Sequence, residues 1–130
     1  MHKSPLNYAG CKYKLLKQIL PIFPNTANSV FYDLFGGSGT VFINVSSKRV
    51  HYNEFNPHVF SIIAKIIQSE TDSLLSLISK IIDEFNLSKE NKDAYYAFRE
   101  YFNSSSSLEN REILLYVLSC HSFSNIIRFN

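Results

Sequence analysis

The sequence has few cysteines and no long apolar run. Its only two cysteines, Cys11 and Cys120, form no metal-type pair. No stretch approaches the roughly 18 consecutive apolar residues that a membrane span requires. The N-terminus, Met1–Pro5, lacks the charged and then apolar profile of a secretory signal. These absences exclude a transmembrane helix and make a reducing cytoplasm the expected compartment.

Strong charge of one sign is also lacking. The 130 residues hold 13 Lys and Arg against 11 Asp and Glu, and 45% of them are hydrophobic, which is typical of a domain that buries a core. The charges are unevenly spread, because residues 1–32 carry four lysines and no acid, whereas residues 70–112 carry nine acids and five bases. The first segment is suited to face phosphate, but a single wide basic face is not expected.

The first half of the chain has the pattern of an α/β unit. Apolar spacing predicts a short helix before the first strand, and a glycine-rich loop separates that strand from the next helix. Asn56 as cap and Pro57 at the first helical position mark a later helix. The predicted elements are a helix over 13–20, a strand over 30–34, the loop 36–39, a helix over 40–45, a strand over 49–52 and a helix from 57.

Beyond Gln68 the periodicity is helical only. Apolar stripes predict helices over 74–85 and 95–102. Ser106 and Glu109 have the spacing of a capping box for a further helix through Ile113 and Leu118. The last residues of the segment Ser122–Asn130 have the pattern of the beginning of a strand, with no partner following. Because parallel strands are normally buried on both faces, we expect further sheet on the C-terminal side.

The loop Asp33–Gly39 carries the first chemical signal. A strand that ends in Asp-Leu-Phe-Gly-Gly-Ser-Gly allows backbone N–H groups to approach a nucleotide-like ligand. A dinucleotide fingerprint would have Gly in place of Phe42, and no Gly-Lys-Ser/Thr follows, so NAD and ATP are disfavoured. Glu54, 21 residues after Asp33, lies where an acid commonly binds ribose hydroxyls. A tight βα turn and a solvated acid remain the structural alternatives.

A second candidate segment, residues 7–12, precedes the first helix. Tyr8 offers a ring for stacking, Gly10 permits close approach and Lys12 offers a cation. An ordinary N-terminal loop explains these residues equally well.

Taken together in order, these motifs resemble the Dam family of DNA adenine-N6 methyltransferases. The matching segments are Asn7–Lys12, Asp33–Gly39, Asn53–Asn56, Ala97–Asn103, Leu114–Leu118 and His121–Asn130. The last segment is most similar to phage-type Dam enzymes, and the resemblance covers essentially the whole chain. It implies an α/β fold: an incomplete Rossmann-like S-adenosylmethionine-dependent methyltransferase domain over residues 1–67, and an all-helical DNA target-recognition domain over residues 68–130 that is truncated in its hairpin.

The resemblance also implies the cofactor site. S-adenosylmethionine would be held with Glu54 on its ribose and Phe35 beside it. The cofactor-binding residues implied are Tyr8, Gly10, Lys12, Asp33, Phe35, Gly36, Gly37, Ser38, Gly39 and Glu54. The sequence departs from the family at Cys11, where many members have another residue, and at Glu54, where Asp is more usual.

Double-stranded DNA is the partner that the resemblance implies, with no membrane and no metal. Arg99 would contact DNA phosphate or the edge of the site, and Phe123 would wedge between base pairs. Ser124 and Asn125 would bind near the displaced adenine, while Arg128 would read guanine, with GATC as the implied target. Judged without the family, Phe123 is a core residue and Arg128 a surface cation. The implied location is the cytoplasm of a bacterial or phage-infected cell.

The family's catalytic motif, of the Asp-Pro-Pro-Tyr type, is missing from these residues. The four prolines, Pro5, Pro21, Pro24 and Pro57, are isolated, and none follows an aspartate. We therefore expect the chain to be the N-terminal part of a Dam-like enzyme, with no catalytic residues of its own. It would be inactive unless a C-terminal complementing polypeptide supplies the motif. The alternative is a non-catalytic module that retains DNA or cofactor binding.

Overall fold

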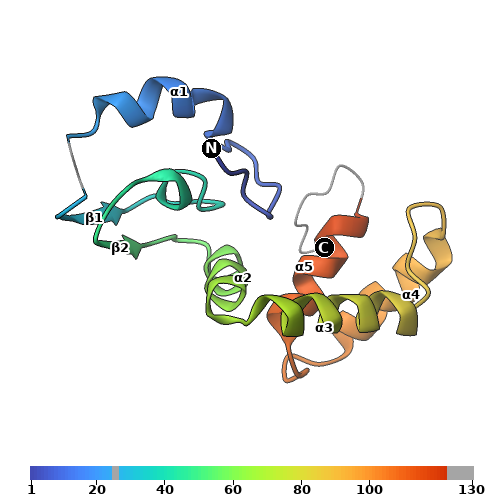
Figure 1. Ribbon diagram of the computed structural model, residues 1–130. Helices are drawn as coiled ribbons and strands as arrows, with labels where there is room; N and C mark the ends of the chain where they lie inside the picture. Colours follow the sequence, from blue (N-terminus) through green and yellow to red (C-terminus); the bar gives the residue numbers. More distant parts are fainter. Residues whose placement is uncertain (25–26, 123–130) are drawn as a thin grey trace. The chain divides into compact units, whose positions relative to one another are not determined.

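The computed structural model describes residues 1–24 and 27–122 of the chain (Figure 1). Contacts divide the chain into two compact units, Met1–Ile63 and Ala64–Asn130. Each unit is described by itself below.

The first unit is built on two parallel strands, β1 (Val30–Asp33) and β2 (Arg49–Tyr52), which lie side by side in Figure 1. Val30 pairs with Arg49 and Asp33 with Tyr52. Parallel strands need a crossover connection, and here it contains the glycine loop. The bounds predicted for β2 are confirmed, whereas β1 ends one residue before the predicted position.

The helix predicted over 40–45 is wrong in extent, because only a 3₁₀ turn, η3 (Phe42–Asn44), forms. The backbone is already extended at Val45. The side-chain amide of Asn44 donates both to Thr40 O, at 2.8 Å, and to His2 O, at 2.8 Å. It therefore connects the turn to the first residues of the chain. This distant partner holds the connection in a short turn where the local pattern favoured more helix.

A helical segment precedes β1, as predicted. It comprises the 3₁₀ turn η1 (Tyr13–Leu15), α1 (Leu16–Ile19) and the 3₁₀ turn η2 (Leu20–Ile22). Leu16 is fully buried and anchors the segment. Phe23 is extended, as the residue before a proline prefers to be, and the segment ends there.

Helix α2 (Pro57–Gln68) follows β2 and begins where the sequence predicted. Asn56 Oδ1 accepts hydrogen bonds from the amides of His58, at 3.0 Å, and Val59, at 3.4 Å, which confirms Asn56 as the cap. Val59, Ile62 and Ile63 are buried, and their spacing of three and four residues marks the inward face of the helix.

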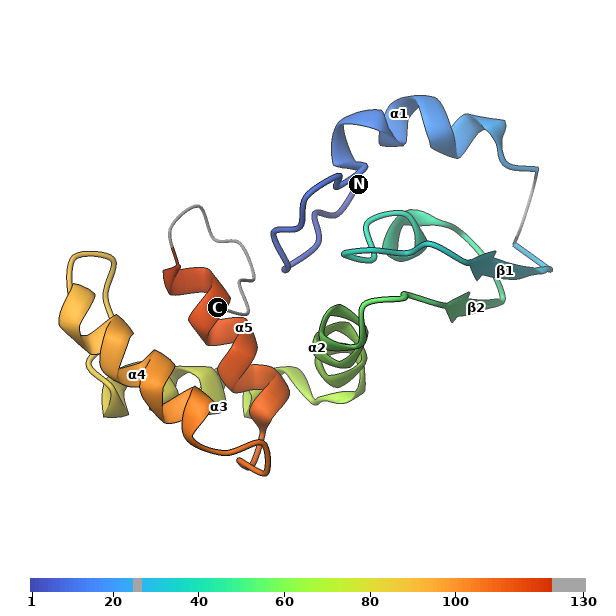
Figure 2. The same cartoon turned by 180° about the vertical axis from the view of Figure 1, so that it is seen from behind.

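The described part of the second unit has helices as its only regular elements. Three follow α2: α3 (Thr71–Glu84), α4 (Lys92–Ser104) and α5 (Arg111–His121). Helix α5 contacts both α3 and α4, and both views show it beside them (Figures 1 and 2). It is the most buried helix, with Ile113, Leu114, Leu115, Val117 and Leu118 in the core.

The capping box predicted at Ser106 and Glu109 is wrong. Helix α5 starts at Arg111, after Asn110, whose φ of 52° is left-handed and whose side chain makes no capping bond. Arg111 Nη1 donates to Phe102 O, at 2.8 Å, and to Ser105 O, at 2.5 Å, so the guanidinium ties the loop to the end of α4. Asparagine tolerates the left-handed region, which lets the helix begin later than the serine pattern indicated.

None of the helices in the described part of the chain has the length and apolar character that crossing a membrane would need. The beginning of a strand predicted in the last residues of the chain lies outside the described residues.

Candidate functional site

The glycine loop lies where β1 and β2 end, and backbone bonds tie it to the end of β2. Gly36 N donates to Asn53 O, at 2.9 Å, and Gly39 N donates to Gly36 O, at 2.8 Å. Gly37 and Gly39 have φ values of +53° and +80°, which residues with a side chain rarely adopt. The loop therefore needs glycine at these two positions to make its turn.

The side-chain carboxylate of Glu54 accepts a hydrogen bond from the backbone of this loop. One carboxylate oxygen, Oε2, accepts from Gly37 N at 2.8 Å, and the other, Oε1, accepts from Asn56 N at 2.9 Å. A carboxylate offers about four lone-pair positions, so two of them remain for further donors. Glu54 can therefore both fix the loop and accept bonds from a ligand's hydroxyl groups.

Tyr52, at the end of β2, also binds the loop through its side chain. Its hydroxyl donates to Gly37 O at 2.5 Å. Its ring packs against Phe42 and Phe60, with centroid distances of 5.0 Å and 5.8 Å. Burial, together with the nearby negative charge of Glu54, raises the pKa of the Tyr52 phenol, so the hydroxyl remains a hydrogen-bond donor at neutral pH.

The segment Tyr8–Lys12, which precedes η1, forms one wall of a cavity, and the glycine loop with Glu54 forms the opposite wall. Gly10 has a φ of +80°, and Lys12 Nζ donates back to Gly10 O at 2.7 Å. Cys11 Sγ lies 3.1 Å from Thr40 Oγ1. Burial alone would raise the pKa of the Cys11 thiol, but the hydrogen bond with Thr40, with smaller contributions from its other neighbours, outweighs burial and lowers it.

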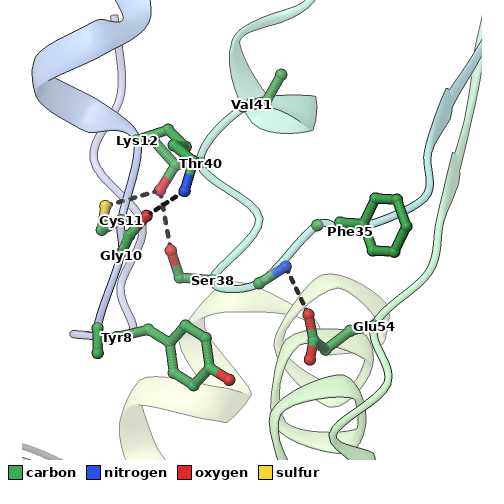
Figure 3. A pocket seen from close by; sticks show the side chains of 12 residues that line it. Tyr8, Gly10, Cys11, Lys12, Phe35, Ser38, Thr40, Val41 and Glu54 are labelled. Atoms are coloured by element: carbon green, nitrogen blue, oxygen red, sulfur yellow. Dashed lines mark hydrogen bonds between the residues drawn. The ribbon is translucent and has the colours of Figure 1, made fainter.

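Between the two walls lies a cavity of about 140 Å³, seen from close by in Figure 3. Its lining residues are Tyr8, Ala9, Gly10, Cys11, Lys12, Phe35, Gly36, Gly37, Ser38, Thr40, Val41 and Glu54. Ligand pockets usually measure about 300–1,000 Å³, so this cavity can enclose only part of a nucleoside-sized ligand. Phe35 at the rim is 93% exposed and offers an uncovered ring to the remainder.

Two buried hydroxyl groups form the floor of this cavity. Ser38 and Thr40 are 4% and 2% exposed, and their hydroxyl oxygens lie 2.9 Å apart. Ser4 Oγ donates to Ser38 O at 2.5 Å. The Ser4 contact joins the N-terminal segment to the glycine loop, and Figure 3 shows a second link, between Cys11 and Thr40.

Asp33, at the end of β1, does not line the cavity. Its Oδ2 atom is buried and receives no hydrogen bond from the described residues. Burial raises the pKa of the Asp33 carboxyl, the Phe42 amide opposes this effect, and the charge of Glu54 adds to it. A buried oxygen without a donor is costly, so a donor brought by a ligand or by water would stabilise it.

The cavity brings together most of the residues that the sequence singled out for a cofactor. Tyr8, Gly10, Lys12, Phe35, Gly36, Gly37, Ser38 and Glu54 line it. Asp33 and Gly39 lie in the same loop but not in the lining. Sequence reasoning missed Ala9, Cys11, Thr40 and Val41 as lining residues. The position of Thr40 directly after the glycine loop was a usable signal for one of them.

Among the residues proposed to contact DNA, only Arg99 lies in the described part of the chain. It is half-buried on α4, and its guanidinium carbon lies 5.2 Å from the centroid of the Tyr96 ring. Phe123, Ser124, Asn125 and Arg128 lie outside the described residues.

Two parallel strands joined through a glycine loop, with an acid after the second strand, are compatible with a protein of the α/β class. Comparison with known proteins narrows this class. Residues 8–130 match the family described as D12 class N6 adenine-specific DNA methyltransferase. The chain belongs to this family, which consists of DNA-modifying transferases.

Individual relatives include restriction-modification and Dam enzymes. The chain is 42% identical over 128 residues to modification methylase StsI of Streptococcus sanguinis. The aligned region covers 98% of this chain and 19% of that protein. It is 38% identical over 128 residues to the type II methyltransferase M.FokI of Planomicrobium okeanokoites, with the same coverage of 98% and 19%. It is 30% identical over 131 residues to a DNA adenine methylase of Haemophilus influenzae, covering 99% of this chain and 44% of that protein. The chain thus spans from about a fifth to less than half of the length of these relatives.

Proposed function

We propose that this chain is the cofactor-binding part of a DNA adenine-N6 methyltransferase, and that its cofactor is S-adenosylmethionine. The observation that carries the proposal is the cavity between the glycine loop and the Tyr8–Lys12 segment, with Glu54 on its wall. Family membership supports the reaction class, and the cavity supports a ligand that is partly a nucleoside.

The residues present fit this cofactor. The two unused lone-pair positions of Glu54 suit the ribose hydroxyls, and the half-buried Tyr8 ring suits stacking on adenine. The exposed Lys12 side chain suits the methionine carboxylate. When bound, S-adenosylmethionine supplies the methyl group. The protein's own part in this account is to hold and orient the cofactor at the ends of the strands.

The transfer itself needs residues that this chain does not have. An Asp-Pro-Pro-Tyr motif, which accepts the adenine amine and stacks on the flipped base in this family, does not occur among the 130 residues. Positioning of the acceptor contributes most of the catalysis. We therefore propose that these 130 residues alone do not methylate DNA, and that a C-terminal polypeptide carrying the motif restores transfer.

The proposed DNA contacts belong to residues 68–130. Arg99 would contact phosphate or the edge of the site, Phe123 would wedge between base pairs, and Ser124 and Asn125 would bind near the displaced adenine. Arg128 would read guanine within a GATC target. Such an enzyme would act on DNA in the cytoplasm of a bacterial or phage-infected cell. Because the chain is more similar to StsI than to the Dam enzyme, a test of the target needs random-sequence DNA besides GATC.

The alternative is a non-catalytic module that binds DNA or the cofactor, and the missing catalytic motif favours it. Adding a C-terminal polypeptide that carries the catalytic motif distinguishes the two proposals, because only the enzyme fragment would then methylate DNA. Salt-dependent DNA binding without any partner that restores transfer would favour the module.

Calorimetric titration of the full chain with S-adenosylmethionine tests the proposed cofactor. We expect saturable binding that Tyr8→Ala weakens about fivefold or more, since stacking of a base on an aromatic ring contributes about 1–3 kcal/mol. Tyr96→Ala, which removes an exposed tyrosine on α4, is the matched control and is expected to leave binding unchanged. Absence of heat with a chain shown to be folded would contradict the cofactor assignment.

A further inference from the structure

The hydroxyl of Tyr52 donates a hydrogen bond to the Gly37 carbonyl of the glycine loop, with 2.5 Å between the two oxygens. Tyr52 does not line the cavity, and the cofactor site described above does not use it. Its contact spans 15 residues of sequence and joins β2 directly to the loop.

We infer that Tyr52 is a positioning residue for cofactor binding, because its hydroxyl sets the orientation of the Gly37–Ser38 peptide. This inference rests on the proposed function. It adds a group that acts through the loop and has no contact with the cofactor.

The geometry at Gly37 supports this role. The two backbone polar groups of Gly37 are both held by side chains from the end of β2: the amide by Glu54 and the carbonyl by Tyr52. The peptide bond is planar, so a bond that fixes the carbonyl of Gly37 also fixes the direction of the Ser38 amide. Gly37 has a φ of +53° and no side chain to restrict it, so these two bonds hold its backbone in this conformation.

The surroundings of Tyr52 keep its hydroxyl in place. Phe42 and Phe60 pack against the ring, and a Cβ at Gly36 would clash with ring carbons Cε2 and Cδ2, so the ring lies directly under the loop. The carboxylates of Glu54 and Asp33 lie near enough to oppose ionisation of the phenol. The hydroxyl therefore remains protonated and donates to Gly37 throughout the neutral range.

Tyr52→Phe is the direct test, because it removes the hydroxyl and keeps the ring. With S-adenosylmethionine as the probe, we expect the Kd to rise about three- to tenfold, the range that corresponds to loss of one net hydrogen bond. Tyr32→Phe is the matched control, since Tyr32 is an exposed tyrosine of β1 that stacks on His51. It is expected to leave the Kd unchanged.

A spectroscopic readout separates positioning from general destabilisation. In amide NMR spectra of Tyr52→Phe, we expect the Gly37 and Ser38 signals to shift and the Gly37 amide to exchange faster with solvent. The Gly39 amide, which bonds to Gly36 O, and the amides of α5 are expected to stay unchanged.

Phe23→Leu covers the case in which Tyr52→Phe is poorly folded. It removes an aromatic contact of the first unit, between Phe23 and Phe31, and leaves the Tyr52 ring and hydroxyl unchanged. At an equal loss of thermal midpoint, Phe23→Leu is expected to retain cofactor affinity that Tyr52→Phe loses. An equal Kd in Tyr52→Phe and Tyr32→Phe, or an equal loss in Tyr52→Phe and Phe23→Leu, would overturn the inference. Failure of the wild-type chain to bind S-adenosylmethionine would instead overturn the proposed function.

Discussion

At the scale of single residues, the site depends on the places where a side chain is missing. Gly36 lies directly on the Tyr52 ring, and Gly39 lies on the Phe42 ring, so a Cβ at either position would overlap carbon atoms of that ring. Gly10 has only the flexible end of Lys12 near its Cβ position, at 3.8 Å. The glycines therefore serve different purposes: close packing at Gly36, backbone conformation at Gly10 and Gly37, and both at Gly39.

Gly36→Ala is expected to destabilise the fold by about 1–3 kcal/mol, because the Tyr52 ring is held on both sides and cannot move away without cost. Gly10→Ala is the matched comparison. It incurs only the strain of a positive φ, about 1 kcal/mol. Urea unfolding of both variants measures the difference. Equal destabilisation by the two substitutions would contradict the packing described here.

The carboxyl of Asp33 gives the stability of the first unit a distinctive pH dependence. Burial, with a smaller contribution from the charge of Glu54, raises its pKa in the folded state. The folded state then holds the proton more tightly than the unfolded state. Stability therefore falls as the pH rises from the ordinary Asp pKa through the raised one.

Asp33→Asn removes this titration. We expect its free energy of unfolding, relative to that of the wild type, to be more favourable at neutral pH than in acid below the ordinary pKa of Asp. Denaturant unfolding of both proteins at the two pH values measures it. A difference between variant and wild type that is independent of pH would contradict the raised pKa.

At the scale of elements, the helix starts show which signals in the sequence are local. Asn91 Oδ1 accepts from Ala94 N at 3.2 Å and caps α4. The Glu70 carboxylate accepts from the amides of Asp72, at 3.0 Å, and Ser73, at 2.7 Å, and caps α3. Helix α5 has no side-chain cap, because Asn110 takes the left-handed conformation instead.

Asn91→Ala is expected to lower the free energy of unfolding by about 1 kcal/mol, the usual effect of losing a helix cap. Ser106→Ala is the control for the capping box that does not form, and is expected to change stability by less than about 0.5 kcal/mol. Thermal or urea unfolding distinguishes them. A larger loss at Ser106 than at Asn91 would contradict the observed start of α5.

Glu70 is expected to give the opposite pH dependence to Asp33. Hydrogen bonds from the Asp72 and Ser73 amides lower its pKa in the folded state. Its contribution to stability is present above the ordinary Glu pKa and is lost as the pH falls through the lowered one. Glu70→Gln should therefore flatten the acid limb of the stability curve, and carboxyl NMR titration of the wild type should show the lowered pKa directly.

The elements also show how far the sequence alone predicts this fold. The bounds of β2, the start of α2 at Pro57 and the helical stripes of the second unit were predictable, because alternation, capping and periodicity are properties of neighbouring residues. The short η3 turn was not, because the Asn44 amide bonds to His2, 42 residues away. The late start of α5 likewise depends on Arg111 reaching the carbonyl of Phe102.

The candidate site shows the same difference between local sequence patterns and contacts of distant residues. Its main residues were identifiable from the ordered motifs, and Tyr8, Lys12, Gly37 and Glu54 do meet at one cavity. The roles of Cys11 and Tyr52 were not, because each arises from a contact between distant segments, such as the one between Cys11 and Thr40. Residues that act through the backbone of a loop leave no pattern of their own in the sequence.

At the scale of the whole molecule, the chain combines family membership with a missing catalytic motif. It belongs to the D12 class over residues 8–130, yet 128 of its residues correspond to only 19% of the StsI methylase. In the described residues, the two strands leave Tyr32 60% exposed, and Phe35 and Phe55 beyond the strand ends are 93% and 98% exposed. The described part of the chain therefore leaves these three aromatic side chains largely uncovered.

Methyl transfer to DNA, measured with and without a complementing polypeptide, tests the central claim most directly. Purified chain, S-adenosylmethionine and a duplex containing GATC, with a random-sequence duplex pool beside it, form the first reaction. The second adds a folded C-terminal methyltransferase fragment that carries Asp-Pro-Pro-Tyr. The account predicts N6-methyladenine only in the second reaction, and its loss when the aspartate of the added motif is replaced. Methylation by the chain alone would contradict the claim that these 130 residues hold the cofactor but lack the catalytic group.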